Sequence, residues 1–232
     1  MEAIILAGGI GSMLKGFLKD IPKPMAPING KPFLEIILDH LNISGFKSVV
    51  LSVGHLSYVI EDHFGNSYKN ITIKYAVEKE RLGTGGAIKY ALNFCKQDYI
   101  FIFNGDTFLD LDFKELLSVK EKNQLNPIMV SRNVEDVSRY GSLVTNNNKL
   151  IDYREKKDFG RGDINAGCYI LPRTINLNKN KIDTFSFEST SIPLIMTNKG
   201  FIVFKHKGLF IDIGVPEDLL KASALLNDLT NI

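Results

Sequence analysis

Short apolar runs alternate with helical patterns through the first half of the chain. Continuous hydrophobic runs are typical of buried strands, and they occupy residues 3–7, 48–53, 71–76 and 99–103. Apolar residues recur at helical spacing in residues 33–41, 58–64, 87–94 and 113–119. We expect Ser57 and Thr84 to cap the second and third of these helices. The order of strand, loop and helix predicts a parallel, doubly wound sheet with helices on both faces.

The second half has a different pattern. Short strand-like runs follow one another at residues 128–132, 141–144, 150–154 and 164–171. A further helix at 189–199, strands at 201–205 and 209–212, and an amphipathic helix at 216–229 complete the predicted elements. We therefore predict an α/β fold with a Rossmann-like, mostly parallel mixed sheet and a small antiparallel lobe. No linker or repeat interrupts the sequence, so residues 1–232 are expected to form one domain with halves 1–125 and 126–232.

Composition and charge exclude several classes of protein. The 28 basic and 26 acidic residues give a net charge of +2, without the basic excess typical of nucleic-acid binders. No apolar run is long enough to span a bilayer, and the first residues lack the positive charge of a signal peptide. Cys95 and Cys168 lie far apart and show no metal-ligand spacing. We expect a reduced, cytoplasmic protein that binds neither nucleic acid nor membranes.

A glycine-rich loop, LAGGIGSMLK at residues 6–15, follows the first predicted strand. Ligands bind at the carboxyl ends of parallel strands, where glycines let backbone amides cradle an anion. The loop lacks the third glycine of a dinucleotide fingerprint, and Phe17 and Leu18 replace the Lys-Ser/Thr of a P-loop. Farther along, Lys23 lies between two prolines that hold it on a stiff segment. A ligand-free turn and a solvated lysine are the alternatives.

Several motifs together resemble those of sugar-1-phosphate nucleotidyltransferases. They are GGIGS (8–12), PKP (22–24), EKERLGTGGA (78–87), FNGDT (103–107), YREK (153–156), INAGCYI (164–170) and FIDIGVPEDL (210–219). Their order matches the family over nearly the whole chain. The short length and the wording of the motifs are most similar to D-glycero-D-manno-heptose 1-phosphate guanylyltransferases, with mannose-1-phosphate guanylyltransferases next.

The resemblance implies a nucleotidyltransferase-type fold and the transfer of a nucleotidyl group from an NTP to a sugar 1-phosphate. GTP and D-glycero-D-manno-heptose 1-phosphate are the favoured substrates, and the products would be a GDP-sugar for surface polysaccharide synthesis and pyrophosphate. Another NTP or sugar phosphate, such as mannose 1-phosphate, is the alternative. The sequence does not fix the oligomeric state and leaves a homodimer open.

Asp106 and Asp212 each follow a predicted strand, at the edge where ligands bind. The resemblance makes both acids ligands of Mg²⁺, which prefers one or two carboxylates together with phosphate oxygens. Capping of a strand end or a turn is the alternative for each. Together with Lys23 they form the expected catalytic set.

The resemblance assigns further residues to the two substrates. Among them, an acid such as Glu78 or Glu80 suits the N1–H and N2–H₂ donors of guanine, although the sequence contains no unique base code. The nucleotide would be bound by Leu6, Ala7, Gly8, Gly9, Gly11, Ser12, Lys15, Lys23, Glu78, Glu80, Gly83, Thr84, Asn104 and Gly105. The sugar phosphate would be bound by Gly141, Glu155, Lys156 and Asn165.

The glycine-rich loop departs from the family pattern at Met13, where an arginine is usual. Methionine cannot bind phosphate. Lys15 or Arg81 could supply the charge, or the protein could be a weak enzyme or a nucleotide-binding protein without activity. We favour retained activity because the other motifs are present, and we expect Met13→Arg to raise kcat/KM. None of the 4 histidines lies in a catalytic motif, so we expect structural or surface roles for them.

Overall fold

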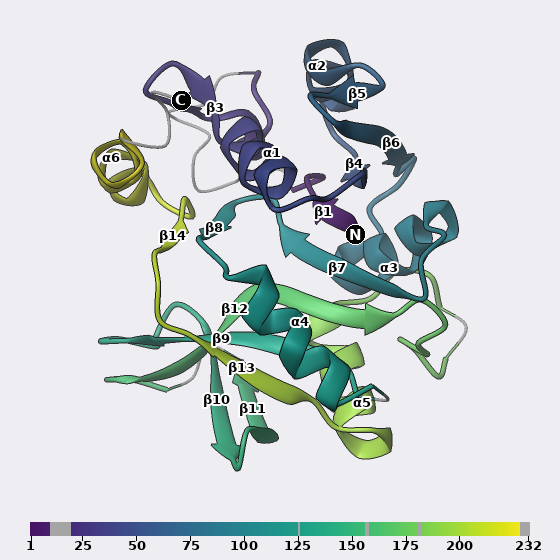
Figure 1. The fold of residues 1–232 in the computed structure, drawn as a ribbon, viewed down its shortest axis with the longest axis vertical. Coiled ribbons are helices and arrows are strands. Elements are labelled where there is room, and N and C mark those ends of the chain that lie inside the picture. Colours follow the sequence, from purple (N-terminus) through teal and green to yellow (C-terminus); the bar gives the residue numbers. More distant parts are fainter. Residues whose placement is uncertain (10–19, 125, 156–157, 181, 228–232) are drawn as a thin grey trace.

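A ten-stranded mixed sheet forms the centre of the computed structural model, which describes residues 1–9, 20–124, 126–155, 158–180 and 182–227 (Figure 1). Strand β1 (Glu2–Leu6) lies between β4 (Ser48–Val53) and β7 (Tyr99–Asn104), and β6 (Ile71–Val77) follows β4. These strands are parallel, and Ile4 is paired with both Val50 and Ile102. A short antiparallel strand, β5 (Ser67–Tyr68), forms the edge. The predicted parallel first half is confirmed.

The strands of the second half continue the same sheet from β7. Strand β12 (Gly162–Pro172) pairs antiparallel with both β7 and β9 (Ile128–Val134), and β13 (Ile202–His206) runs parallel to β9. The hairpin of β10 (Gly141–Asn146) and β11 (Lys149–Glu155) completes the order β10-β11-β13-β9-β12-β7-β1-β4-β6-β5. The predicted antiparallel strands are thus present, as an extension of the central sheet.

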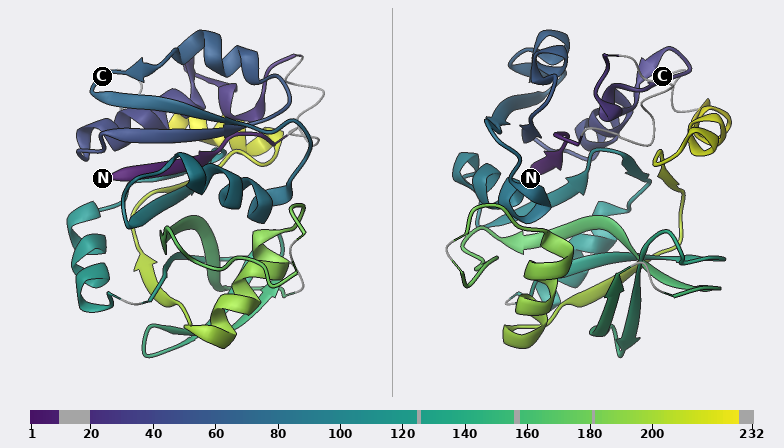
Figure 2. Two further views of the ribbon diagram at one scale, coloured as in Figure 1. Left: turned by 90° about the vertical axis from the view of Figure 1, so that its right-hand side faces the viewer. Right: turned by 180° about the vertical axis from the view of Figure 1, so that it is seen from behind.

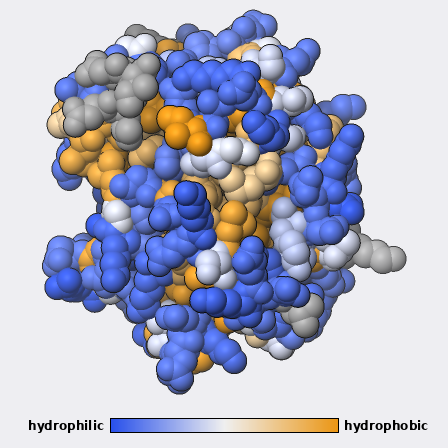
Figure 3. Space-filling view, viewed as in Figure 1, coloured by the Kyte–Doolittle hydropathy of each residue, from blue (hydrophilic) through white to orange (hydrophobic). Residues whose placement is uncertain are grey.

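Helices cover both faces of the sheet (Figure 2). One hydrophobic cluster packs buried side chains of α1 (Phe33–Ile43), α2 (Ser57–Phe64), α4 (Phe113–Lys122) and α6 (Pro216–Leu225) against it. The other cluster contains buried side chains of α3 (Gly83–Ala91), the π-helical turn η4 (Phe187–Ser191) and α5 (Ile192–Asn198). Hydrophilic side chains cover most of the face shown in Figure 3. None of the helices in the described ranges is both long and apolar enough to cross a membrane.

Small elements bring distant parts of the chain to the carboxyl ends of the central strands. Strand β8 (Thr107–Leu109) follows β7 and pairs antiparallel with β14 (Phe210–Asp212). The 3-10 turn η2 (Lys23–Met25) precedes a two-stranded ribbon of β2 (Pro27–Ile28) and β3 (Lys31–Pro32). A second 3-10 turn, η3 (Leu92–Phe94), extends α3. The β8–β14 pair places the segment after β14 beside the end of β7.

Two predicted helix caps are wrong. Ser57 is the first residue of α2, and Leu56 occupies the cap position with a φ of +59° and no side-chain cap bond. Thr84 lies inside α3, which begins at Gly83 rather than near Ala87. A tertiary contact accounts for the position of Thr84, because its hydroxyl is bonded to another part of the chain, whereas the Ser57 amide bonds locally to the Gly54 carbonyl oxygen at 3.0 Å. The predicted helix at 189–199 is also divided, into η4 and α5.

Candidate active site

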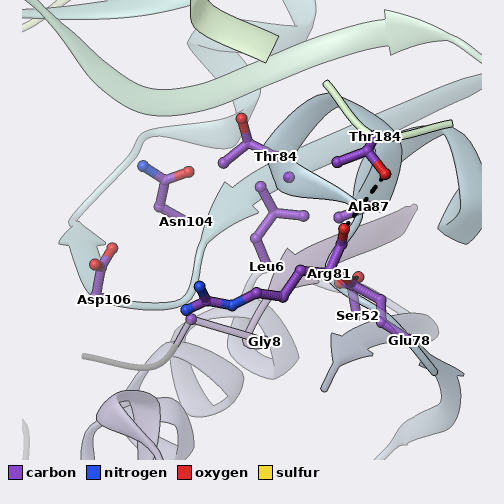
Figure 4. Close-up of a pocket in the computed structure, with 12 residues that line it drawn as sticks. Leu6, Gly8, Ser52, Glu78, Arg81, Thr84, Ala87, Asn104, Asp106 and Thr184 are labelled. Atoms are coloured by element: carbon purple, nitrogen blue, oxygen red, sulfur yellow. Dashed lines mark hydrogen bonds between the residues drawn. The ribbon is translucent and has the colours of Figure 1, made fainter. Parts of the chain in front are cut away.

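Two adjoining cavities open at the carboxyl ends of the parallel strands. The first has a volume of about 500 Å³ and is lined by Leu6, Gly8, Gly9, Ser52, Glu78, Arg81, Gly83, Thr84, Ala87, Asn104, Asp106 and Thr184 (Figure 4). The second, of about 540 Å³, extends toward β10, β11 and β14. Thr84, Asn104 and Asp106 line both cavities. The two spaces are therefore halves of one cleft, with Asp106 where they meet.

Glycines let the ends of the strands approach one another at the base of the first cavity. A Cβ on Gly105 would lie 2.6 Å from the carbonyl oxygen of Leu6, which accepts a hydrogen bond from the Gly105 amide at 3.0 Å. A Cβ on Gly8 would lie 3.2 Å from Glu78 Oε1. Leu6, Gly8 and Gly9 line the cavity, whereas Ala7 and Gly105 are buried behind it. The predicted sites at Gly11, Ser12 and Lys15, and the unusual Met13, lie outside the described residues.

Glu78 is held at the far side of the first cavity. Its carboxylate accepts hydrogen bonds from Ser52 Oγ at 3.1 Å and from the Leu82 amide at 3.2 Å. Glu80, the other acid expected at a base site, is exposed and lines a separate hollow beside Lys89. Of the two acids, the structure therefore places only Glu78 in the cavity.

The start of α3 is packed tightly against a loop from the second half of the chain. Gly83 has a φ of +69°, and a Cβ there would lie 2.6 Å from the carbonyl oxygen of Phe185. Thr84 Oγ1 donates a hydrogen bond to Glu188 Oε2 at 2.6 Å and accepts one from the Phe187 amide at 2.8 Å. Thr84 therefore joins the two halves of the chain between the two cavities.

Asp106 and Asp212 lie next to each other, although 105 residues lie between them in the sequence. Asp212 is opposite Thr107 in the β8–β14 pair, and the Ile213 amide donates to the Asp106 carbonyl oxygen at 3.0 Å. Lys23 Nζ donates to Asp106 Oδ2 at 2.5 Å, and the Lys23 side chain is only 12% exposed. The expected catalytic set of Lys23, Asp106 and Asp212 is thus brought together.

The electrostatics of the acid pair are unfavourable for two ionised carboxylates. Burial, with the charge of Asp106 next in size, raises the pKa of Asp212 to about 6. The positive charges of Lys23 and Arg139 oppose this rise only in part. The positive charges around Asp212 are therefore too weak to keep its pKa at the ordinary value.

The donors at this point fit a divalent ion such as Mg²⁺. Within the described ranges no group of three or more His, Cys, Asp or Glu side chains could hold a metal by itself. Asp106 lies in the turn between β7 and β8, and Asp212 ends β14. Two such carboxylates leave coordination positions for phosphate oxygens and water, which is the arrangement that Mg²⁺ favours. Asp106 and Asp212 would be its protein ligands.

The second cavity contains the described residues that were expected at the sugar site. Gly141 and Glu155 are opposite each other in the β10–β11 pair, and both line the cavity with Asn165. Asn165 donates to the Tyr169 hydroxyl at 2.6 Å and accepts from the Gly167 amide at 3.1 Å, so its orientation is fixed. Lys156 lies outside the described residues.

Sequence reasoning missed several residues that line the second cavity. Glu188 is held by Thr84 and by Ser186 Oγ at 2.9 Å. Arg139 lines the cavity and pairs with Asp218 at 2.6 Å, and burial raises the pKa of the neighbouring Tyr140 to about 12. Arg139 and Tyr140 directly precede Gly141 in the sequence. Their position next to a predicted site residue is the feature that could have indicated their place in the cavity.

The histidines do not line either cavity. His63 contacts Glu35 at 3.0 Å, and His206 contacts Asp110 at 3.1 Å. His40 packs between Phe rings, and His55 is exposed. Their expected structural or surface positions are confirmed.

Comparisons with known proteins identify the family. A family model described as Nucleotidyl transferase matches residues 2–228. D-glycero-alpha-D-manno-heptose 1-phosphate guanylyltransferases from Campylobacter jejuni and Aneurinibacillus thermoaerophilus are 41% and 38% identical, over 94% and 96% of this chain and 96% of each relative. A crystal structure of HddC from Yersinia pseudotuberculosis complexed with GMP-PN is 37% identical with a TM-score of 0.84, covering 97% of this chain and 99% of that one. Mannose-1-phosphate guanyltransferases are more distant, at 29–32% identity. The resemblance predicted from the motifs is confirmed, and the chain belongs to the nucleotidyl transferase family.

Proposed function

We propose that the chain is a guanylyltransferase that transfers GMP from GTP to D-glycero-D-manno-heptose 1-phosphate. A phosphate oxygen of the sugar 1-phosphate attacks the α-phosphorus of GTP. The bond between the α-phosphorus and the oxygen bridging to the β-phosphate breaks, and pyrophosphate leaves. The observation that carries this proposal is the meeting of Asp106 and Asp212 where two substrate-sized cavities join.

The first cavity suits a guanine nucleotide. Glu78 can accept hydrogen bonds from the N1–H and N2–H₂ groups of guanine, because each carboxylate oxygen retains acceptor capacity beyond its bond to Ser52 or Leu82. The glycines after β1 leave room for phosphates near Asp106. The GMP-PN complex of HddC supports this choice of base.

The second cavity suits a sugar phosphate. Glu155, Glu188 and Asn165 offer oxygen and nitrogen atoms for sugar hydroxyls, and the Gly141 backbone lies beside them. The names of the more similar relatives favour heptose 1-phosphate over mannose 1-phosphate. The product would be GDP-heptose, made in the cytoplasm for surface polysaccharides. That the protein forms a homodimer stays a prediction.

The chain's residues position and neutralise two polyanions in this mechanism. Asp106 and Asp212 would hold Mg²⁺, which when bound neutralises phosphate charge and polarises the phosphoryl group under attack. Lys23 fixes the Asp106 carboxylate and adds a positive charge at the junction of the cavities. The sugar phosphate is already largely ionised near pH 7, because its second pKa is about 6, so no side chain has to act as a general base. Positioning and charge neutralisation therefore provide the rate enhancement.

Pyrophosphate release measured with purified protein and Mg²⁺ tests the proposal. GTP, ATP, CTP and UTP are each combined with heptose 1-phosphate or mannose 1-phosphate, and the Asp212→Asn variant serves as the inactive control. We expect the highest kcat/KM for GTP with heptose 1-phosphate. A higher value with mannose 1-phosphate would contradict the choice of sugar. Nucleotide binding without pyrophosphate release in any combination would favour the non-enzymatic alternative suggested by Met13.

A further inference from the structure

The first cavity contains one positively charged side chain among its described lining residues, that of Arg81. Among its described lining residues, Glu78 and Asp106 are acids and Arg81 is the only base. Arg81 belongs to the loop between β6 and α3, and its carbonyl oxygen accepts a hydrogen bond from Thr184 Oγ1 at 3.4 Å. The Arg81 backbone is therefore attached to the cavity wall, and its side chain extends from there into the cavity.

The Arg81 side chain crosses the cavity. In Figure 4 it starts near Thr184 and Ser52 and ends with its guanidinium beside Gly8, on the side of the cavity where Asp106 lies. Within the part of the chain that the structure describes, this guanidinium has no hydrogen-bond or ion-pair partner. Five N–H donors and a permanent positive charge thus face the space above the end of β1.

The direction of the side chain separates two possible ligands. An arginine that read the guanine base would be expected to point toward Glu78, which is placed to bind the donor edge of that base. The guanidinium instead lies toward Gly8 and Asp106, where the phosphates are expected. A planar guanidinium binds phosphate oxygens through paired hydrogen bonds, so its chemistry matches this position.

We propose that Arg81 binds the β- and γ-phosphates of the nucleotide from the β6–α3 loop. This inference rests on the proposed function, because it assumes a nucleoside triphosphate in the first cavity. It also provides a cation in a site whose glycine-rich loop has Met13 where the family pattern has arginine. Arg81 was one of the open alternatives for that charge, and its position in the cavity favours it.

The test removes the charge and measures how the loss depends on the number of phosphates. Affinities for GMP, GDP and GTP are measured by calorimetry in the presence of Mg²⁺ for the wild type, Arg81→Gln and Arg81→Lys. The matched control is Lys79→Gln, which removes one positive charge from the same loop at an exposed position outside the first cavity. Thermal denaturation of each variant verifies that it is folded.

We expect Arg81→Gln to weaken GTP binding about 10-fold or more, GDP binding less, and GMP binding by under about 2-fold, because charge-assisted bonds to phosphate are lost. Lysine would restore part of the GTP affinity, and Lys79→Gln would leave all three affinities within about 2-fold. An equal loss for GMP, GDP and GTP would overturn the proposal in favour of a contact with the guanosine, and so would an unchanged GTP affinity.

The same series with adenine nucleotides separates this inference from the proposed function. If the protein prefers ATP, the proposed base specificity fails, but a loss that grows from AMP to ATP in Arg81→Gln would still support the phosphate contact. If GTP is preferred and the phosphate dependence is absent, the role of Arg81 fails while the proposed reaction stands.

Discussion

Replacing Asp212 by asparagine is expected to change stability and activity in opposite directions. In the metal-free protein the carboxyl group is buried beside Asp106, and these two causes raise the pKa of Asp212 to about 6. Asparagine has nearly the same shape but carries no charge. The variant therefore removes an unfavourable charge from the folded protein and, at the same time, a proposed ligand of Mg²⁺.

The size of the stability change follows from the pKa. Each pKa unit corresponds to about 1.4 kcal/mol, so a rise from 3.8 to about 6 costs the folded protein about 3 kcal/mol at pH 8. Because the folded protein holds the proton more tightly than the unfolded chain, the wild type loses stability as the pH rises from about 4 through 6. The cost is about half as large near pH 5 and nearly vanishes below about pH 3.

Urea denaturation in EDTA at pH 5 and pH 8 measures this difference. We expect Asp212→Asn to be more stable than the wild type by up to about 3 kcal/mol at pH 8, and by about half that amount at pH 5. Asp62→Asn is the matched control, because Asp62 is exposed on α2, and we expect its stability to change by less than about 0.5 kcal/mol at either pH. In the pyrophosphate assay Asp212→Asn is expected to lose about 10²- to 10⁴-fold in kcat.

Two results would refute this reasoning. A variant that is less stable than the wild type at pH 8 would mean that neighbouring cations compensate the Asp212 charge fully. A gain of equal size at pH 5 and pH 8 would mean that the gain does not arise from the titration of this carboxyl group. Near-normal turnover would separately remove Asp212 from the metal site.

Three further substitutions test other parts of the structure. Glu78→Gln is expected to lower kcat/KM for GTP about 10- to 100-fold through lost charge-assisted bonds to the base; unchanged selectivity between GTP and ATP would remove Glu78 from the base site. A Cβ on Gly86 would overlap a backbone carbonyl oxygen, so Gly86→Ala is expected to cost about 1–3 kcal/mol in urea denaturation. A Cβ on Gly9 would meet no atom of the described residues within 4 Å, so Gly9→Ala is expected to cost little. Equal stabilities of these two variants would contradict the close packing of α3. Burial lowers the pKa of His40, so the unfolded chain takes up a proton below about pH 6.5 more readily than the folded protein, and stability falls with acidification. His40→Leu is expected to lose less stability than the wild type on acidification, which urea denaturation at several pH values measures. The same dependence of stability on pH in both proteins would contradict this role of His40.

Local patterns were sufficient to predict most of the elements. The hydrophobic runs that became β4 and β7 contain few polar residues, because both faces of these strands are covered by helices. The predicted strand at 48–53 has the observed bounds, and the one at 99–103 is extended by Asn104. Strand ends also predicted the positions of the two acids, since ligands bind at that edge of a parallel sheet.

Features that depend on distant contacts could not be predicted in this way. Thr84 has the residue type of a helix cap, but its hydroxyl bonds to Glu188, 104 residues later in the chain. Glu188 directly precedes the predicted helix at 189–199, and an acid near a helix start is common for local reasons. Nothing in its sequence neighbourhood indicates that the loop before η4 packs on α3 and brings this carboxylate to the second cavity.

Two charges of opposite sign in the cleft are poorly compensated by the described residues. Asp212 lacks sufficient positive charge, and the guanidinium of Arg81 has no partner in the described chain. A nucleoside triphosphate with Mg²⁺ would satisfy both at once, because the ion faces the acids and the phosphates face the guanidinium. Binding of metal and nucleotide should then be mutually favourable, and by linkage each must raise the affinity of the other by the same factor. Titrating GTP with and without Mg²⁺ measures this factor, and Asp212→Asn is expected to reduce it while Arg81→Gln lowers the affinity for GTP.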